Sequence, residues 1–269
     1  MRLIFGSGKI GSLFTAPGDR IVSHQECDIS DVNRVMEIVK KYQPSVVINA
    51  AANTSLESCE ENKKASFQVN TLGPLNLLHA AESHQAKLVH ISSGCIFDGN
   101  KTISTEQSPP NTSVWYTHTK KWADDYIVSY GYEKYLILRP RQMISAIAHP
   151  TNMLTKFSKY KVLNVHQEQN SVTCVTDFKE MIEHLLLHKK TGIFNCCNEG
   201  TISPYDVALG VQKYINPSLE VNPTSYEYTL TLQPNRRVNT ILSNDKLKET
   251  GFKPRRASEA LEWSLKNYG

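Results

Sequence analysis

Short apolar segments recur along the first half of the chain, and longer segments with helical spacing separate them. The apolar segments at residues 2–5, 20–23, 45–48, 87–91 and 135–138 predict strands. Their continuous apolar character is typical of parallel strands that are buried on both faces of a sheet. Strands of this kind alternating with helices predict an α/β fold with a doubly wound parallel sheet.

Three segments have apolar residues three and four positions apart, which is the spacing of one helix face. This pattern predicts helices over Ile29–Tyr42, with Ser30 as the N-cap, over Asn70–Gln85 and over Val114–Tyr130. We expect these helices to cover the faces of the sheet.

The second half of the chain has a less regular pattern. Residues Ile193–Cys197 predict one more strand of the sheet, and Pro204–Ile215 and Ala257–Tyr268 predict helices. We therefore expect a nucleotide-binding domain over residues 1–140. A smaller region over residues 141–269 would mainly bind substrate, with some of its segments returning to the core.

Composition excludes several classes of protein. Of the 269 residues, 40% are hydrophobic and 21% are charged, as in ordinary globular proteins. The net charge of +4 comes from scattered basic residues, which argues against a nucleic-acid partner. No apolar stretch approaches the ~18 residues of a membrane span, and the start lacks the pattern of a signal peptide. Six cysteines without CxxC spacing indicate a cytoplasmic chain with reduced thiols and no metal site.

A glycine-rich sequence, GSGKIG, directly follows the first predicted strand and opens a predicted helix. Backbone amides at such a position can hold a pyrophosphate, and the missing side chains let it approach. An ordinary glycine-rich turn is the alternative. The residues expected to bind a dinucleotide are Gly6, Ser7, Gly8, Lys9, Ile10 and Gly11, in a sheet of the Rossmann type.

The end of the second predicted strand bears on the choice of cofactor. An acidic residue there would bind the ribose 2′-hydroxyl of NAD, but residues 21–25 contain none. Glu26 lies slightly beyond the position at which this acidic residue is expected. This favours NADPH, with NADH as the alternative. Arg20, His24 or Lys9 could meet the 2′-phosphate.

Tyr116 and Lys120 form a YxxxK sequence on a predicted helix. Residues four apart share a helix face, and a nearby ammonium lowers the pKa of a phenol from about 10. Such a tyrosine can protonate a ketone oxygen as hydride arrives at the carbon. The alternative is a surface helix that happens to carry a tyrosine and a lysine.

These features together resemble the extended short-chain dehydrogenase/reductase family over nearly the whole chain. Further landmarks are residues 27–31, 47–52, 69–70, 92–93 and 138–140. The resemblance implies that Ser93 binds the substrate oxygen and that Asp28 contacts adenine. It also implies a cofactor-binding set that includes Ile29, Asn49, Ala50, Ala51, Asn70, Tyr116, Lys120 and Arg139. The glycine spacing is one residue tighter than the usual GxxGxxG, and the first helix and second strand are abbreviated.

Within that family, Ile96-Phe97-Asp98-Gly99 is similar to the reductases that make 6-deoxy sugars, of the dTDP-4-dehydrorhamnose type. Those reductases typically have an aspartate and a tyrosine where this chain has Gly94-Cys95. The sequence SGCIF at 93–97 instead resembles bifunctional UDP-4-keto-6-deoxyglucose 3,5-epimerase/4-reductases, which complete UDP-L-rhamnose. Further agreement lies at residues 116–121, 138–145, 152–156, 191–195 and 214–218.

The chemistry of epimerisation gives Cys95 a role. A ketone at C4 acidifies the hydrogens on C3 and C5, and inversion needs a base and an acid on opposite faces. A thiol whose pKa is lowered by a cation can be the base, and the resemblance places the acid at Lys156. The alternative is that Cys95 is a small buried packing residue. Substrate contacts are expected at Ser93, Gly94, Arg141, Asn152 and Arg237, the last near the diphosphate.

The leading hypothesis is therefore an enzyme that uses NADPH to epimerise and reduce UDP-4-keto-6-deoxy-D-glucose to UDP-β-L-rhamnose. The first alternative is a reductase only, of the dTDP-4-dehydrorhamnose reductase type. The second is a non-catalytic nucleotide-binding regulatory subunit. The sequence leaves open the base of the nucleotide sugar and whether the chain forms a homodimer.

Overall fold

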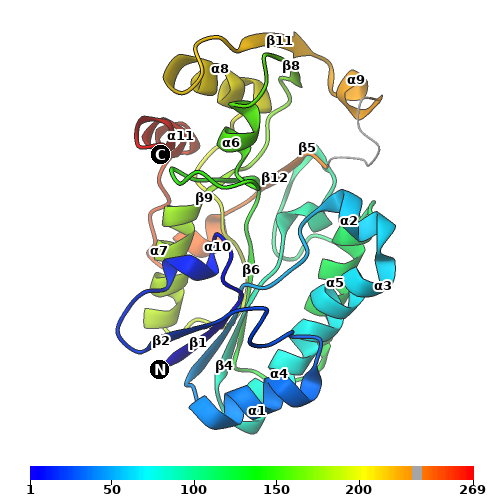
Figure 1. Cartoon of the computed structure of the whole chain (residues 1–269), viewed down its shortest axis with the longest axis vertical. Coiled ribbons are helices and arrows are strands. Elements are labelled where there is room, and N and C mark those ends of the chain that lie inside the picture. Colours follow the sequence, from blue (N-terminus) through cyan, green and yellow to red (C-terminus); the bar gives the residue numbers. More distant parts are fainter. Residues whose placement is uncertain (232–237) are drawn as a thin grey trace. The chain divides into compact units, whose positions relative to one another are not determined.

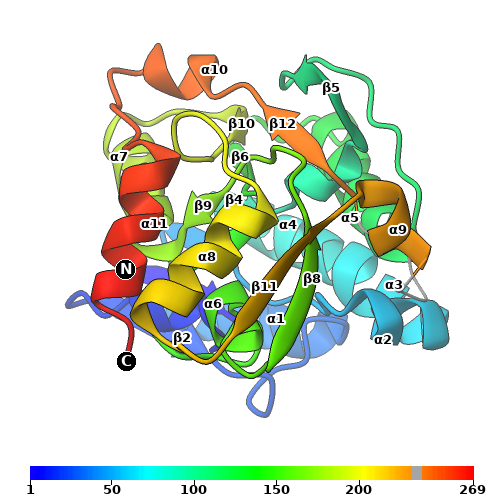
Figure 2. The same cartoon turned by 90° about the horizontal axis from the view of Figure 1, so that it is seen from above.

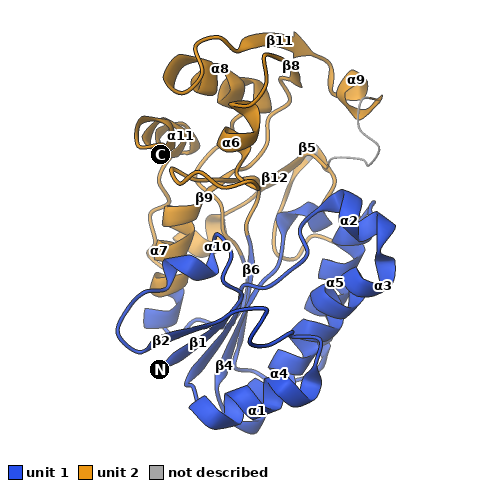
Figure 3. Cartoon of the chain, in the orientation of Figure 1, with its two compact units in different colours: residues 1–96, 112–139, 185–194 blue, residues 97–111, 140–184, 195–269 orange. Residues whose placement is uncertain are grey.

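The computed structural model of the chain describes residues 1–231 and 238–269, which form two compact units (Figure 3). Unit 1 consists of residues 1–96, 112–139 and 185–194, and unit 2 consists of the remaining described residues. Both units are therefore built from segments that are discontinuous in the sequence. The functional division expected near residue 140 stays a prediction.

The sheet of six strands belongs mainly to unit 1 and confirms the α/β fold class. Its strands are β1 (Arg2–Phe5), β2 (Asp19–Val22), β3 (Val46–Asn49), β4 (Lys87–Ile91), β6 (Tyr135–Arg139) and β10 (Gly192–Asn195). Their order is β10-β6-β4-β3-β1-β2, and β2, β1, β3, β4 and β6 pair in parallel (Figure 1). The order reverses between β1 and β3, and ligands of such sheets bind at the carboxyl ends of the strands at this point.

Three helices pack on one face of this sheet, α1 (Val32–Tyr42), α4 (Gly73–Ser83) and α5 (Trp115–Ser129) (Figure 1). The strands contribute fully buried apolar residues to the shared core, among them Phe5 and Leu88. Burial of each such side chain stabilises the fold by roughly 1.5–3 kcal/mol. The continuous apolar character of the strands is explained by this burial.

Helix α1 begins three residues later than the sequence pattern predicted, and its N-cap is Asp31 rather than Ser30. The Asp31 carboxylate accepts a hydrogen bond from the Arg34 amide at 3.1 Å. Ser30 instead donates its amide and its hydroxyl to Asp28, at 2.9 and 2.8 Å. The expected N-cap was wrong because the hydroxyl of Ser30 is used by the turn before the helix.

The helix predicted over residues 70–85 starts earlier and is interrupted. Helix α2 (Leu56–Glu61) is followed by α3 (Lys63–Phe67), a π-helical segment η2 (Gln68–Leu72) and α4. Gly73 lies at the junction because a Cβ there would be 2.5 Å from the side chain of Ile29. The glycine thus permits close packing of α4 on the turn before α1.

The helix expected after the glycine-rich loop is reduced to one 3-10 turn, η1 (Gly11–Leu13). Pro17 and Gly18 follow shortly afterwards, and this pair is a strong turn signal. Phe14 is buried instead, and the Arg2 guanidinium lies 5.3 Å from the centre of its ring. The predicted helix N-terminus is therefore replaced by a compact loop.

Unit 2 contains three two-stranded pairs and most of the remaining helices. The pairs are β8 (Val162–His166) with β11 (Glu220–Thr224), β5 (Gly99–Ser104) with β12 (Thr240–Leu242), and β7 (Met143–Ile144) with β9 (Thr173–Cys174). The helices are α6 (Met153–Phe157), α7 (Val175–Leu187), α8 (Pro204–Tyr214), α9 (Tyr226–Thr231), α10 (Asp245–Lys248) and α11 (Ala257–Lys266), and α7 ends in unit 1. Figure 2 shows α8 beside β11 and β8, and partly buried apolar residues of these two strands pack against the core to which α8 contributes.

Within residues 1–231 and 238–269, no helix is long and apolar enough to cross a membrane. The same residues contain no cluster of histidine, cysteine and acidic side chains that could hold a metal ion. All six cysteines are free thiols.

Candidate active site

The glycine-rich loop after β1 lies against the loop after β3, at the point where the strand order reverses. Gly6 has a φ of +105°, and a Cβ there would be 2.7 Å from the amide nitrogen of Ala51. A Cβ on Gly11 would lie 1.8 Å from the carbonyl oxygen of Gly6. A Cβ on Gly8 would meet nothing within 4 Å. The fold therefore requires glycine at positions 6 and 11, whereas Gly8 faces open space.

The amides of this loop fit a phosphate-bearing cofactor. Among the described residues, those of Ser7, Gly8 and Ile10 donate no hydrogen bond. Consecutive unpaired N–H groups in a loop form a concave site for an anion. Since η1 is a single 3-10 turn, these loop amides, rather than a helix dipole, would carry the attraction.

On β2, one expected contact to the 2′-phosphate, Arg20, is already engaged. The guanidinium of Arg20 binds both carboxylate oxygens of Glu26, each at 2.7 Å. Glu26 therefore lies near the second strand, but an arginine neutralises its charge. Among the three predicted cations, Arg20 would have to leave this pair to bind a phosphate.

Asp28, the expected adenine contact, has one oxygen that is engaged. Its Oδ1 accepts both hydrogen bonds from Ser30, while Oδ2 has no hydrogen-bond partner among the described residues. Burial acts to raise the pKa of Asp28, but the bonds from Ser30 outweigh it and hold the pKa below its usual value. Asp28 thus offers a charged acceptor. Ile29, in contrast, is buried against α4.

Tyr116 and Lys120 both lie on the inner face of α5, and their side chains are 8% and 1% exposed. The start of this helix is fixed by its neighbours. The Glu60 carboxylate accepts the Trp115 amide at 2.8 Å, and the Thr117 hydroxyl accepts the amide of residue 114 at 3.3 Å. These bonds satisfy amides that a helix start leaves unpaired. The YxxxK pair is therefore on a fixed helix end and not on a solvated face.

The ammonium of Lys120 donates to the carbonyl oxygen of Ile91, at the end of β4, over 2.8 Å. Burial lowers its pKa to about 8, while the nearby Asp124 carboxylate opposes this effect. A lysine with this pKa changes charge near neutral pH and can control an adjacent phenol.

Ser93 follows β4, and Cys95 lies on the short 3-10 turn that comes next, η3 (Gly94–Ile96). The Ser93 hydroxyl oxygen accepts the amide of Cys95 at 3.1 Å, which leaves the hydroxyl hydrogen to donate. Cys95 is partly exposed, whereas the other five cysteines are buried. Burial raises the pKa of Cys27 to about 11 and that of Cys197 to about 12. Cys95 is thus the accessible thiol of the described chain.

Two side chains of the expected cofactor set are used inside unit 1. The Asn70 carboxamide accepts the backbone amide of Asn53 at 2.8 Å and donates to the Asn53 carbonyl at 2.9 Å. It also donates to the Thr119 hydroxyl at 3.2 Å. Arg139 forms a buried ion pair with Asp124. These bonds support the loop after β3 and helix α5, and contact of either side chain with a cofactor stays a prediction.

The remaining expected residues belong to unit 2 or lie outside the described residues. Lys156 is exposed on α6 and has no ion pair within the described chain. Asn152 is buried as the N-cap of α6, and it accepts the Leu154 amide at 3.3 Å. Arg141 is buried, and its guanidinium donates to the carbonyl oxygen of residue 238. Arg237 lies outside the described residues.

Three buried polar residues escaped the sequence prediction. His90 interrupts the apolar run of β4, and Asp124 lies four residues after Lys120 on the same helix face; both patterns could have indicated them. The side chain of Asn239 in unit 2 is 2% exposed, and neither polar atom has a partner among the described residues. A buried carboxamide without partners costs stability unless a ligand satisfies it.

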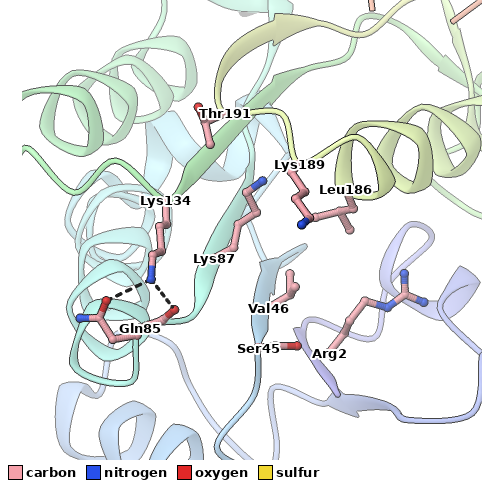
Figure 4. Close-up of a pocket in the computed structure, with 9 residues that line it drawn as sticks. All are labelled: Arg2, Ser45, Val46, Gln85, Lys87, Lys134, Leu186, Lys189 and Thr191. Carbon is pink, nitrogen blue, oxygen red and sulfur yellow. Dashed lines mark hydrogen bonds between the residues drawn. The ribbon is translucent and has the colours of Figure 1, made fainter. Parts of the chain in front are cut away.

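A separate basic pocket of about 460 Å³ lies at the opposite, amino end of the sheet strands (Figure 4). Its cations are Arg2, Lys87, Lys134 and Lys189. Three of them already have partners. Lys87 donates to the Lys190 carbonyl at 2.6 Å, Lys134 turns toward Gln85, and Arg2 pairs with the aspartate that begins β2. This pocket shares no residue with the predicted site.

Comparisons with known proteins find similarity over nearly the whole chain. The family described as RmlD substrate binding domain matches residues 10–269. A bifunctional dTDP-4-dehydrorhamnose 3,5-epimerase/dTDP-4-dehydrorhamnose reductase from Arabidopsis thaliana is 27% identical over 264 residues, covering 91% of this chain and 86% of that protein.

Two solved structures share the fold. The L780 UDP-rhamnose synthase from Acanthamoeba polyphaga mimivirus has a TM-score of 0.87 at 23% identity, covering 99% of this chain and 98% of that one. A dTDP-4-dehydrorhamnose reductase from Bacillus anthracis, in complex with NADP, has a TM-score of 0.87 at 23% identity, covering 97% and 96%.

Proposed function

Since the chain belongs to the RmlD substrate binding domain family, we propose that it is an NADPH-dependent enzyme that makes UDP-β-L-rhamnose from UDP-4-keto-6-deoxy-D-glucose. The reaction has two parts, inversion at C3 and C5 and reduction of the C4 ketone. The observation that carries the proposal is the partly exposed thiol of Cys95, two residues after Ser93. Both follow β4, whose last residue, Ile91, accepts the hydrogen bond from the Lys120 ammonium.

For reduction, the residues of unit 1 supply the proton and the polarisation of the ketone. The bound nicotinamide would supply the hydride. Tyr116 gives its phenolic proton to O4, and the adjacent Lys120 ammonium makes that phenol a stronger acid. Ser93 donates its free hydroxyl hydrogen to the same oxygen. The amides of residues 7, 8 and 10 would hold the pyrophosphate, and Asp28 would accept from the adenine amine.

For epimerisation, the same oxygen-binding pair serves a second purpose. The Cys95 thiolate removes the proton from C3, and the electron pair of that bond moves into an enolate whose O4 is held by Tyr116 and Ser93. Lys156 returns a proton to the opposite face of C3 and so restores the ketone with the configuration inverted. The same sequence at C5 completes the second inversion before reduction.

The names of the relatives support both parts. The Arabidopsis relative is described as an epimerase and a reductase, and the mimivirus structure as a UDP-rhamnose synthase. The Bacillus anthracis reductase was solved with NADP, which favours NADPH here. The absence of an unpaired carboxylate at the end of β2 favours the same cofactor.

The test supplies the purified protein with UDP- or dTDP-4-keto-6-deoxyglucose and with NADPH or NADH, and follows oxidation of the nicotinamide. We expect the highest kcat/KM with the UDP sugar and NADPH, and a loss of turnover in Tyr116→Phe. Tyr126→Phe, elsewhere on the same helix, removes the hydroxyl of a half-buried tyrosine that contacts His79 and should retain turnover. Faster reaction of the dTDP sugar would assign the other base. No oxidation with either sugar would favour a regulatory subunit.

A further inference from the structure

Beneath Tyr116 and Lys120, a row of buried polar side chains connects neighbouring strands to helix α5. We propose that Asn49 and His90 are positioning residues for Lys120: Asn49 holds the His90 imidazole in the tautomer with its proton on Nε2, and this N–H faces the lysine. The inference rests on the proposed function because it takes Lys120 as the catalytic lysine.

The orientation of the Asn49 carboxamide follows from its two contacts. Asn49 and His90 are opposite each other in the register of β3 and β4, and both are buried. The Ala51 amide donates to Asn49 Oδ1 at 3.1 Å, so the NH2 group of Asn49 must face His90. This group lies 3.1 Å from His90 Nδ1. An NH2 group only donates, so Nδ1 accepts and the proton of the neutral ring is on Nε2.

The same contact opposes a positive charge on His90. An imidazolium carries hydrogen on both nitrogens, and its Nδ1–H would then point at the NH2 group of Asn49. Burial, together with the Lys120 ammonium, also holds the pKa of His90 well below its ordinary value. His90 is therefore neutral at physiological pH.

The Nε2–H of His90 faces two groups on α5. The Nε2 nitrogen lies 3.4 Å from Lys120 Nζ and 3.9 Å from Asp124 Oδ1. This oxygen has no hydrogen-bond partner in the described part of the chain. An N–H cannot accept a hydrogen bond from an ammonium, so in this tautomer the 3.4 Å contact is not a hydrogen bond from Lys120. The ammonium donates to the Ile91 carbonyl instead. The carboxylate of Asp124 attracts the N–H of His90 and favours the same tautomer.

The tautomer affects how readily Lys120 loses its proton. The groups that face Lys120 are His90 from β4, Asp124 from its own helix and the Cys59 thiol from α2, with Arg139 of β6 behind Asp124. With the proton on Nε2, His90 adds no acceptor for the ammonium. In the opposite tautomer, the Nε2 lone pair would accept from the ammonium and stabilise its charge. The Asn49–His90 contact therefore favours a lysine that titrates close to neutral pH.

The first test needs no substrate. Long-range proton–nitrogen NMR spectra distinguish the two imidazole tautomers, and the His90 signals are assigned by their loss in His90→Gln. We expect Nε2 protonated and Nδ1 unprotonated throughout the pH range in which free histidine titrates. A ring protonated on Nδ1, or one that titrates in this range, would overturn the proposal.

The second test inverts the tautomer. In Asn49→Asp, a carboxylate oxygen faces Nδ1 and accepts a hydrogen bond from an Nδ1–H, so that Nε2 carries the lone pair and becomes an acceptor for Lys120. We expect the Lys120 side-chain signal, followed by NMR with labelled lysine, to titrate about one pH unit or more higher. Asn53→Asp is the matched control, because Asn53 lies in the loop just after β3 and its side chain donates to Ser58 rather than to His90. Equal titration of Lys120 in both variants would contradict the inference.

Turnover separates this inference from the proposed function. If the UDP sugar is a substrate, the alkaline limb of kcat/KM against pH should move upward in Asn49→Asp and not in Asn53→Asp. If no sugar is turned over, the proposed function fails, but the tautomer and the Lys120 titration still decide the inference. If Asn49→Asp does not fold, the spectra of the unaltered protein decide it alone.

Discussion

Asp124 on α5 and Arg139 at the end of β6 form an ion pair with 3.1 Å between Oδ2 and Nε, and both side chains are almost completely buried. The pair joins the helix of Tyr116 and Lys120 to the sheet. Burial acts to raise the pKa of Asp124, and Arg139, Ser92 and Lys120 oppose this. The position of the YxxxK pair therefore depends on a charge pair that no solvent screens.

Removal of one charge from this pair should be costly. We predict that Asp124→Asn lowers the free energy of unfolding by about 3–5 kcal/mol, because the buried guanidinium of Arg139 loses the charge of its carboxylate partner. Asp125→Asn, which breaks only an exposed pair with Lys121, should change it by about 1 kcal/mol or less. Urea unfolding measures both. Equal effects of the two substitutions would contradict the importance of the buried pair.

His90 should make the protein sensitive to acid. Its pKa in the folded state is well below its ordinary value, so below about pH 6.5 the unfolded chain binds a proton that the folded chain does not. The free energy of unfolding should therefore fall by up to about 1.4 kcal/mol per pH unit as pH decreases below 6.5. Urea unfolding at several pH values measures this slope. His90→Gln should flatten it, and His24→Gln, at an exposed position, should keep it.

The two glycines of the cofactor loop should respond differently to alanine. Gly6→Ala forces a Cβ to within 2.7 Å of the Ala51 amide at a positive φ, so we predict marked destabilisation. Gly8→Ala meets no atom within 4 Å and should leave the melting temperature unchanged. It should nevertheless weaken NADPH binding about tenfold or more, because the new methyl group occupies space for the pyrophosphate. Normal NADPH affinity in Gly8→Ala would remove this loop from the cofactor site.

Cys95→Ser should separate the two activities. A serine hydroxyl is far less acidic than a thiol, so proton abstraction at C3 and C5 should fall by a factor of about 10² or more. Reduction of a substrate that is already epimerised should persist, since Ser93, Tyr116 and Lys120 are unchanged. Product analysis by chromatography checks both. Unchanged epimerisation in Cys95→Ser would leave a reductase with a packing thiol as the better account of this residue.

Lys156→Met should block reprotonation without affecting the reductase residues. Lys156 is exposed on α6, so we expect the fold to remain stable. The loss should appear as slower formation of the rhamno product, while an epimerised substrate is still reduced. Lys159→Met, another exposed lysine just after the helix, is the control. Equal loss in the two variants would point to a general effect of charge rather than to an acid at position 156.

The sheet could be predicted from sequence because its strands are short, apolar and buried on both faces. The strands at residues 87–91 and 135–138 and the helix over 114–130 are confirmed within one residue at each end. The fold class follows from their alternation. The expected helix after the glycine-rich loop was wrong. It rested on the glycine pattern alone, whereas the segment is limited to one turn by Pro17 and Gly18 and by burial of Phe14.

The network behind the candidate site could not be predicted in the same way. His90 appears in sequence as one polar residue in an apolar run, and its role depends on the register that places it opposite Asn49. Asp124 shows helical spacing from Lys120, but its partner Arg139 comes from another strand. Such contacts join residues far apart in the chain, and no local pattern specifies them.

The central claim is that one chain both epimerises and reduces the sugar. The most direct measurement is an NMR spectrum of the product formed from UDP-4-keto-6-deoxyglucose and NADPH in D2O. The account predicts a rhamno product with deuterium at C3 and C5, because both protons exchange through the enolate before hydride reaches C4. A reduced product that retains protium at both carbons would contradict it and would make the protein a reductase only.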